Sequence, residues 1–159
     1  MTDVNELAER CVSRLTERGS NLSVVESCTG GKLAAAITSV PGASIVFIGG
    51  LIAYSDIVKT TIMGVDQLTL DSCGAVSGEC ACELSCNGEV VLGSDYTIAI
   101  TGIAGPGGGT EDKPVGTVFI AWSGPEGVDI EQHLFTGDRL AIQDQSVYRA
   151  LEKLLEILG

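Results

Sequence analysis

The sequence predicts an α/β fold, specifically a three-layer α/β/α sandwich built around a mixed sheet. Segments with helical apolar spacing alternate with short apolar runs typical of buried strands, and two neighbouring alternating runs look like a β-hairpin. The chain has 159 residues, 45% of them hydrophobic, which is enough for one core. No repeat or linker divides it, so we expect a single domain over residues 1–159.

The first part of the chain predicts helices and strands in alternation. Gly19 ends a stretch of amphipathic helical spacing, Pro41 ends the second helix, and the Gly49-Gly50 pair predicts a bulge or bend within an apolar run. The expected elements are a helix at 4–18, a strand at 22–25, a helix at 32–39, a strand at 45–54 and a short helix around 59–63.

The second part predicts one further crossover and then the hairpin. The Asn87-Gly88 pair weakens the first helix of this part, because an interior glycine costs about 1 kcal/mol relative to alanine. Two alternating runs joined by Ser-Gly-Pro-Glu-Gly indicate antiparallel strands, so the sheet should be mixed. The expected elements are a helix at 77–91, a strand at 97–100, hairpin strands at 115–122 and 128–135, and a helix at 140–158.

The charge balance excludes several classes of partner. A net charge of −12 opposes the cationic surface that a binder of nucleic acid or of an anionic membrane needs. No apolar run reaches the ~20 residues that span a bilayer, and the first ten residues lack the apolar core of a signal peptide. We therefore expect a cytoplasmic protein that acts on a small molecule.

The six cysteines raise the question of a disulfide framework or a metal site. Without an export signal they are better interpreted as reduced thiols. On a helix, Cys82 and Cys86 share a face but Cys80 points elsewhere, and the sole histidine, His133, is distant. We expect packing thiols and no metal, although Cys28 stays open as a reactive thiol because it follows Ser27.

Two glycine-rich segments begin where buried strands end, which is where ligands gather in open α/β sheets. In the first segment, Gly30 and Gly31 leave amides uncovered at a helix start, and Ser27 and Thr29 add hydroxyls. The alternative is that Thr29 only caps the helix. Lys32 follows two glycines, but the other residues of a Walker A loop are missing.

The second segment, 101–110, is too long and too rich in glycine to be a simple turn. Its glycines could present successive amides to a phosphate, and the alternative is a flexible surface loop. Its glycine spacing does not fit a dinucleotide-binding fingerprint. The segment contains Gly102, Gly105, Gly107, Gly108 and Gly109.

No Ser-His-Asp triad can be assembled, because His133 lies in an alternating strand pattern typical of a packed or surface histidine. A lysine can act as the base when burial lowers its pKa. Lys59 lies in a mostly apolar segment and is therefore a candidate partner for Ser27.

The motifs together resemble one family, the CinA C-terminal domain, whose members include stand-alone nicotinamide-nucleotide amidohydrolases of the PncC type. The resemblance covers nearly the whole chain in order. It rests on ESCTGG at 26–31, SVPG at 39–42, AYS at 53–55, MGV at 63–65, GAVS at 74–77, TGIAGPGGGT at 101–110 and KPVGTV at 113–118.

The resemblance implies hydrolysis of nicotinamide mononucleotide to nicotinic acid mononucleotide and ammonia at a site without metal or cofactor. It implies Ser27 as the nucleophile or as the hydroxyl that positions water, Lys59 as its base, Tyr54 and Thr101 as polar participants, and both glycine loops as the substrate cradle. A cation such as Arg139 would balance the phosphate, unless it is only a surface residue. The resemblance is also compatible with a homodimer.

The chain departs from the family pattern at Gln143, in the segment 141–143 where many members have arginine, and at Asp56, which replaces a usual asparagine. The lost charge at Gln143 favours an alternative function. The alternative is a non-catalytic protein of the same fold that binds a nucleotide or a protein partner, in line with the family's competence and DNA-damage naming. A purely structural scaffold would leave both glycine loops unexplained.

Overall fold

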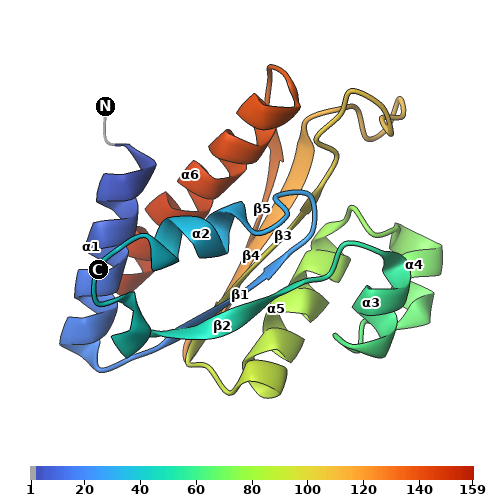
Figure 1. Cartoon of the computed structure of the whole chain (residues 1–159). Helices are drawn as coiled ribbons and strands as arrows, with labels where there is room; N and C mark the ends of the chain where they lie inside the picture. The colour runs from blue at the N-terminus through green and yellow to red at the C-terminus, as the bar shows by residue number, and fades with distance from the viewer. Residues whose placement is uncertain (1–2) are drawn as a thin grey trace.

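The structure is a computed structural model that describes residues 3–159 as the expected three-layer sandwich (Figure 1). A five-stranded sheet runs in the order β2-β1-β3-β4-β5. The strands are β1 (Leu22–Glu26), β2 (Phe47–Ile52), β3 (Tyr96–Gly102), β4 (Thr117–Gly124) and β5 (Gly127–Leu134). The helices are α1 (Val4–Arg18), α2 (Lys32–Thr38), α3 (Asp56–Thr61), α4 (Gln67–Cys73), α5 (Gly78–Leu92) and α6 (Arg139–Leu158), with a short 3-10 helix, η1 (Ala43–Ile45).

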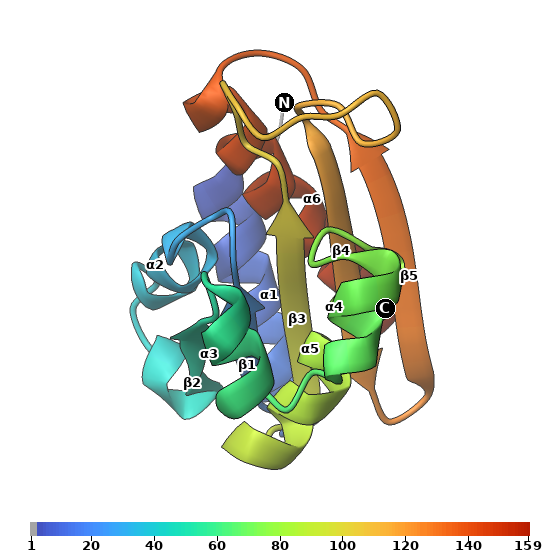
Figure 2. The same ribbon diagram turned by 90° about the vertical axis from the view of Figure 1, so that its right-hand side faces the viewer.

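The sheet is mixed, as the hairpin predicted. β1 pairs in parallel with β2 and β3, whereas β4 is antiparallel to both β3 and β5. The hairpin closes at the pair Gly124 and Gly127, which flanks a two-residue turn. Figure 2 shows β3 in the middle of the molecule, with β1 and β2 on one side and β4 and β5 on the other.

Helices cover both faces of the sheet, which explains why the central strands are apolar on both sides. Along β1, Val24 packs with α1, α2 and α6, whereas Val25 packs with α5 and the segment that holds α3 and α4. On β3, Ile98 likewise packs on the face covered by α1, α2 and α6, and Ala99 on the opposite face. None of the helices within residues 3–159 is long and apolar enough to cross a bilayer.

Several boundaries differ from the sequence-based expectation. β2 is Phe47–Ile52 rather than 45–54, and the hairpin strands are Thr117–Gly124 and Gly127–Leu134 rather than 115–122 and 128–135. Two other segments differ more. One short helix was expected around 59–63, but the structure has α3 and, in addition, α4, whose first turn is capped by Asp66 through a 2.9 Å bond from the Leu68 amide. β3 also continues beyond Ile100, because β4 pairs with Thr101 and Gly102. The glycine-rich loop therefore begins only at residue 103.

Two glycines allow elements to approach closely. The predicted bulge in β2 leaves Ile48 without a partner on β1, and a Cβ added at Gly50 would lie 2.6 Å from Val24 Cγ2. At Gly88 an added Cβ would lie 2.7 Å from Thr97 Cγ2, so the glycine that weakened the helix prediction lets α5 pack directly on the sheet.

Candidate active site

The site lies where β1 and β3 end. These strands are parallel neighbours in register from Leu22 with Tyr96 to Glu26 with Ile100, so the segments that follow them leave the sheet at one edge. A cavity of about 270 Å³ lies there. Figure 2 shows the glycine-rich loop at this end of β3, beside the first turn of α6.

Most of the residues predicted from the sequence meet in this cavity. Those that line it are Ser27, Tyr54, Lys59, Thr101, Gly102, Gly105, Gly107, Gly108 and Arg139. Four others, Thr29, Gly30, Gly31 and Gly109, do not line it. Cys28, which the sequence left open as a reactive thiol, also lines the cavity. So do five residues that were not predicted as site residues, namely Asp56, Ala75, Val76, Ile103 and Ala104.

The floor of the cavity is a serine–lysine pair. Lys59 Nζ lies 3.1 Å from Ser27 Oγ, and the side chains come from α3 and from the turn after β1. The lysine also donates to the backbone carbonyl oxygens of Ala53, at 2.8 Å, and Tyr54, at 3.0 Å. Lys59 is 2% exposed and Ser27 7% exposed, so bulk water barely reaches either group.

Burial lowers the pKa of the Lys59 amine from its ordinary value of 10.5, because desolvation penalises the ammonium form. The Cys80 thiol and the Asp56 carboxylate oppose this shift, as do Cys28 and Tyr54. A neutral amine has two N–H groups and one lone pair. When the amine is neutral, the two carbonyl oxygens can accept both N–H groups, and the lone pair then faces the Ser27 hydroxyl 3.1 Å away. The geometry is that of a general base beside its nucleophile.

A buried carboxylate holds the turn that carries Ser27. Glu26 is 1% exposed and accepts hydrogen bonds from Thr29 Oγ1 at 2.7 Å, the Leu33 amide at 2.9 Å and the Ala34 amide at 3.0 Å. It therefore caps the first turn of α2 from the end of the neighbouring strand. These amides and the Thr29 hydroxyl are engaged internally, which explains why the helix start does not face the cavity.

Arg139, Tyr54 and the glycine loop form the mouth of the cavity. Arg139 donates to the Gly105 carbonyl oxygen at 2.6 Å and to the Tyr54 hydroxyl at 3.0 Å. Thr101 is buried, and its hydroxyl donates to the Ala75 carbonyl oxygen at 2.8 Å. Arg139 thus presents a positive charge between the loop and Tyr54, whereas Thr101 mainly fixes the segment before α5.

The sequence analysis missed the structural roles of Glu26 and Gln143. Gln143 is 9% exposed and donates from Nε2 to the Cys28 carbonyl oxygen at 2.8 Å, so it ties α6 to the turn that carries Ser27. A charged residue that ends an apolar strand just before a helix was the available signal for Glu26. No local signal marked Gln143, because its partner lies 115 residues away in sequence.

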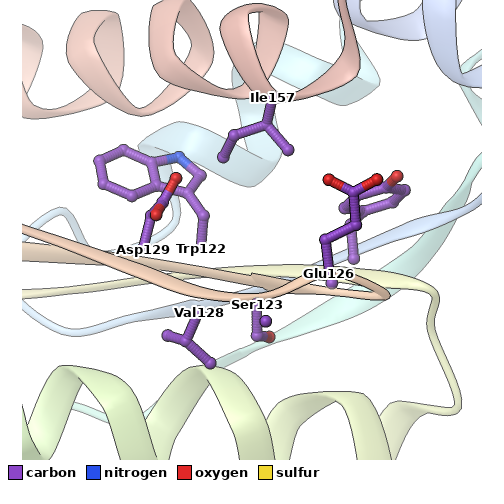
Figure 3. A pocket seen from close by; sticks show the side chains of 9 residues that line it. Trp122, Ser123, Glu126, Val128, Asp129 and Ile157 are labelled. Atoms are coloured by element: carbon purple, nitrogen blue, oxygen red, sulfur yellow. The ribbon is translucent and has the colours of Figure 1, made fainter.

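A second cavity, of about 210 Å³, lies at the opposite end of the sheet beside the β4–β5 turn (Figure 3). It is lined by the carboxylates of Glu126 and Asp129, and no lysine, arginine or histidine among the described residues lines it. The Ser123 hydroxyl donates to the Ser85 carbonyl oxygen at 3.0 Å, away from any base. This cavity therefore lacks a hydroxyl paired with a basic amine of the kind found in the first cavity.

The remaining candidates from the sequence lie outside the active-site chemistry. Desolvation raises the pKa of the Cys28 thiol to about 12, so this cysteine is a poor nucleophile. His133 stacks on Phe135 with ring centroids 4.9 Å apart and lies 2.8 Å from Glu131, as expected of a packed histidine. Within residues 3–159, no group of three or more histidine, cysteine or acidic residues has metal-binding geometry.

Comparison with known sequences gives consistent matches. The family model described as the CinA C-terminal domain matches residues 4–158. A CinA-like protein of Parasynechococcus marenigrum is 47% identical over 156 residues, which cover 96% of this chain and 37% of that protein. A CinA-like protein of Thermotoga maritima is 46% identical over 153 residues, again 96% of this chain and 37% of that protein. The chain thus spans well under half the length of these relatives.

Solved structures agree over the full chain. A competence/damage-inducible protein from Agrobacterium tumefaciens superposes with a TM-score of 0.97 at 35% identity, covering 100% of this chain and 98% of that one. A CinA superfamily protein from Klebsiella pneumoniae gives a TM-score of 0.95 at 37% identity, covering 99% and 98%. These neighbours have the same α/β architecture as the chain described here.

Proposed function

The chain belongs to the CinA C-terminal domain family, and from this premise we propose that it is an amidohydrolase that converts nicotinamide mononucleotide to nicotinic acid mononucleotide and ammonia. The observation that carries the proposal is the buried pair of Ser27 and Lys59, 3.1 Å apart on the floor of a cavity. Amide hydrolysis needs an activated oxygen nucleophile, and this pair supplies one.

In the first step, Ser27 Oγ attacks the carboxamide carbon while its proton moves to the neutral amine of Lys59. The carbonyl oxygen becomes an oxyanion, to which the backbone amides of the loop after β3, which lines the cavity, could donate. The Lys59 ammonium, held by the Ala53 and Tyr54 carbonyl oxygens, then protonates the departing nitrogen, and ammonia leaves.

In the second step, water attacks the Ser27 ester. Lys59, neutral again after ammonia has left, takes one proton from the water and passes it to Ser27 Oγ as the ester bond breaks. The acid that is released loses its remaining proton to solvent and becomes the carboxylate. Direct attack by a water molecule that Ser27 positions is the other route the same geometry allows. Trapping the ester with hydroxylamine distinguishes the two routes, because only the ester yields a hydroxamate.

The mouth of the cavity suits the remainder of the mononucleotide. Arg139 offers a guanidinium whose hydrogen-bond partners in the structure are uncharged, so a phosphate would be a stronger acceptor than either partner. The loop glycines at 105, 107 and 108 let the backbone approach a bulky ligand closely. The chain thus provides a base and nucleophile at depth and an anion site at the entrance.

The test is release of ammonia and of nicotinic acid mononucleotide from nicotinamide mononucleotide by the purified protein. Ser27→Ala and Lys59→Met are expected to lower kcat by at least about 10³-fold, because each removes one member of a unit that acts together. Ser123→Ala is the matched control, since it removes an equally buried hydroxyl from the other cavity. No product from the unaltered protein would refute the proposal.

The binding-only alternative rested on Gln143. In the structure this side chain is engaged with the Cys28 carbonyl oxygen, so its lack of charge removes nothing from the cavity lining. The same assay tests the alternative. Stabilisation of the protein by nicotinamide mononucleotide without product would select binding over hydrolysis.

A further inference from the structure

The cavity carries two opposite charges that have no ion-pair partner. Arg139 bonds to a carbonyl oxygen and a phenol, and neither it nor Asp56 takes part in an ion pair within residues 3–159. Both residues line the cavity, above the buried serine and lysine. A ligand that carries both charges would therefore find a complementary group for each.

The position of Asp56 is unfavourable for the chemistry unless a cation binds. Asp56 and Lys59 are three residues apart on α3, and the Asp56 carboxylate favours the ammonium form of the lysine. A base is needed in its neutral form, so this carboxylate works against catalysis in the empty cavity. A cationic ligand beside Asp56 would offset its negative potential at the lysine.

Tyr54 contacts both Lys59 and Arg139. Its backbone carbonyl oxygen binds Lys59, its hydroxyl binds Arg139, and its side chain is 57% exposed although it lines the cavity. An exposed tyrosine ring in a cavity that is also lined by a carboxylate is a favourable platform for a flat cation.

We propose that Asp56 is a specificity-determining residue, which selects substrates whose carboxamide is carried on a cationic heteroaromatic ring, while Arg139 selects their anionic tail. This inference rests on the proposed function and adds that the site recognises the positive charge of the substrate ring. A neutral ring of the same shape gains nothing from Asp56.

Two substrates that differ in ring charge test the role of Asp56. Nicotinamide mononucleotide has a cationic ring, and its reduced form has a neutral ring with the same carboxamide, ribose and phosphate. Asp56→Asn is expected to lower kcat/KM for the oxidised form about five-fold, the effect of one partly exposed ion pair. It should not lower kcat/KM for the reduced form and should raise it if anything, because the variant no longer favours the ammonium form of Lys59. Intrinsic reactivity cancels, because each variant is compared with the unaltered protein on the same substrate.

A third substrate and a control variant complete the design. Nicotinamide riboside keeps the cationic ring and lacks the phosphate, so Arg139→Gln should lower kcat/KM about ten-fold or more for both mononucleotides and spare the riboside. Glu79→Gln removes one first-turn carboxylate from α5, outside the cavity, and is expected to change none of the three values.

The outcomes separate the two proposals. Absence of hydrolysis by the unaltered protein refutes the proposed function and, with it, the proposal that Asp56 recognises the charge of the substrate ring. Normal hydrolysis combined with an equal loss on both mononucleotides in Asp56→Asn overturns only the role of Asp56. Calorimetric Kd values for the two mononucleotides, measured with Ser27→Ala, give the same comparison without turnover.

Discussion

Replacing Glu26 by glutamine should destabilise the protein far more than a change of one atom suggests. The carboxylate is 1% exposed and accepts three hydrogen bonds. The amide oxygen of glutamine can keep the bonds from Thr29 Oγ1 and the Leu33 amide, but its NH₂ group then faces the Ala34 amide, donor to donor. Two buried donors are left unsatisfied at about 1–3 kcal/mol each.

The expected loss is about 3 kcal/mol, since removing a buried charge returns part of that cost. For a chain of this size, this corresponds to a fall in Tm of about 6–12 °C, measured by thermal unfolding at pH 7. The hydrolysis rate of the folded variant should fall as well, because Glu26 holds the turn that places Ser27 against Lys59.

Glu83→Gln is the matched control. Glu83 also accepts a backbone amide near a helix start, from Asp66 at 2.7 Å, but it is only partly buried. Water can replace its lost bonds, so the cost should stay near 1 kcal/mol or below. Equal Tm shifts for the two variants would show that Glu26 does not stabilise the start of α2 more than a partly buried carboxylate would.

Four further predictions follow from burial and charge. The acid limb of the kcat/KM profile should lie below pH 10.5, because burial lowers the pKa of Lys59; a limb at or above 10.5 would exclude Lys59 as the base. Gly88→Ala should cost about 1–3 kcal/mol in urea unfolding, since the new Cβ meets Thr97; an unchanged midpoint would contradict that packing. Iodoacetamide at pH 8 should leave Cys28 unmodified by mass spectrometry, because its pKa of about 12 keeps the thiol protonated; rapid labelling would refute its burial. Arg149 chiefly lowers the Glu131 pKa to about 2, so the Glu131 carboxylate stabilises the fold above its unfolded pKa of about 4.5. Glu131→Gln should cost about 1 kcal/mol at pH 7, a difference that shrinks as pH falls through 4.5 toward 2; a constant difference would contradict the pair.

Much of the fold follows from local patterns in the chain. Apolar spacing and glycine or proline at segment ends identify α1, α2, α5 and the hairpin, because these signals act within a few residues. The segment around α3 and α4 was harder, since two short helices joined by Gly64 show less than two turns of periodicity each. The last two residues of β3 are strand only because β4 pairs with them.

The candidate site, too, was predicted only in part from the sequence. The resemblance and the loop positions pointed to Ser27, Lys59 and Arg139, and the structure brings all three to one cavity. The sequence also assigned Thr29 and its neighbouring glycines to the substrate cradle, whereas the Thr29 hydroxyl donates to Glu26. The direction of a hydroxyl side chain at a helix start depends on which acceptor the neighbouring strand supplies. The spacing of residues in the sequence does not specify that acceptor.

By itself, the sequence determined the class of fold and the edge of the sheet at which chemistry can occur, because periodicity and glycine placement are local properties of the chain. Only the tertiary structure decided that the Lys59 amine faces Ser27 across 32 residues, that Glu26 occupies the amides of α2 and that Asp56 and Arg139 share one entrance. Those contacts depend on how the helices pack on the sheet. Packing brings together residues that are far apart in sequence, and no local sequence pattern predicts which of them will meet.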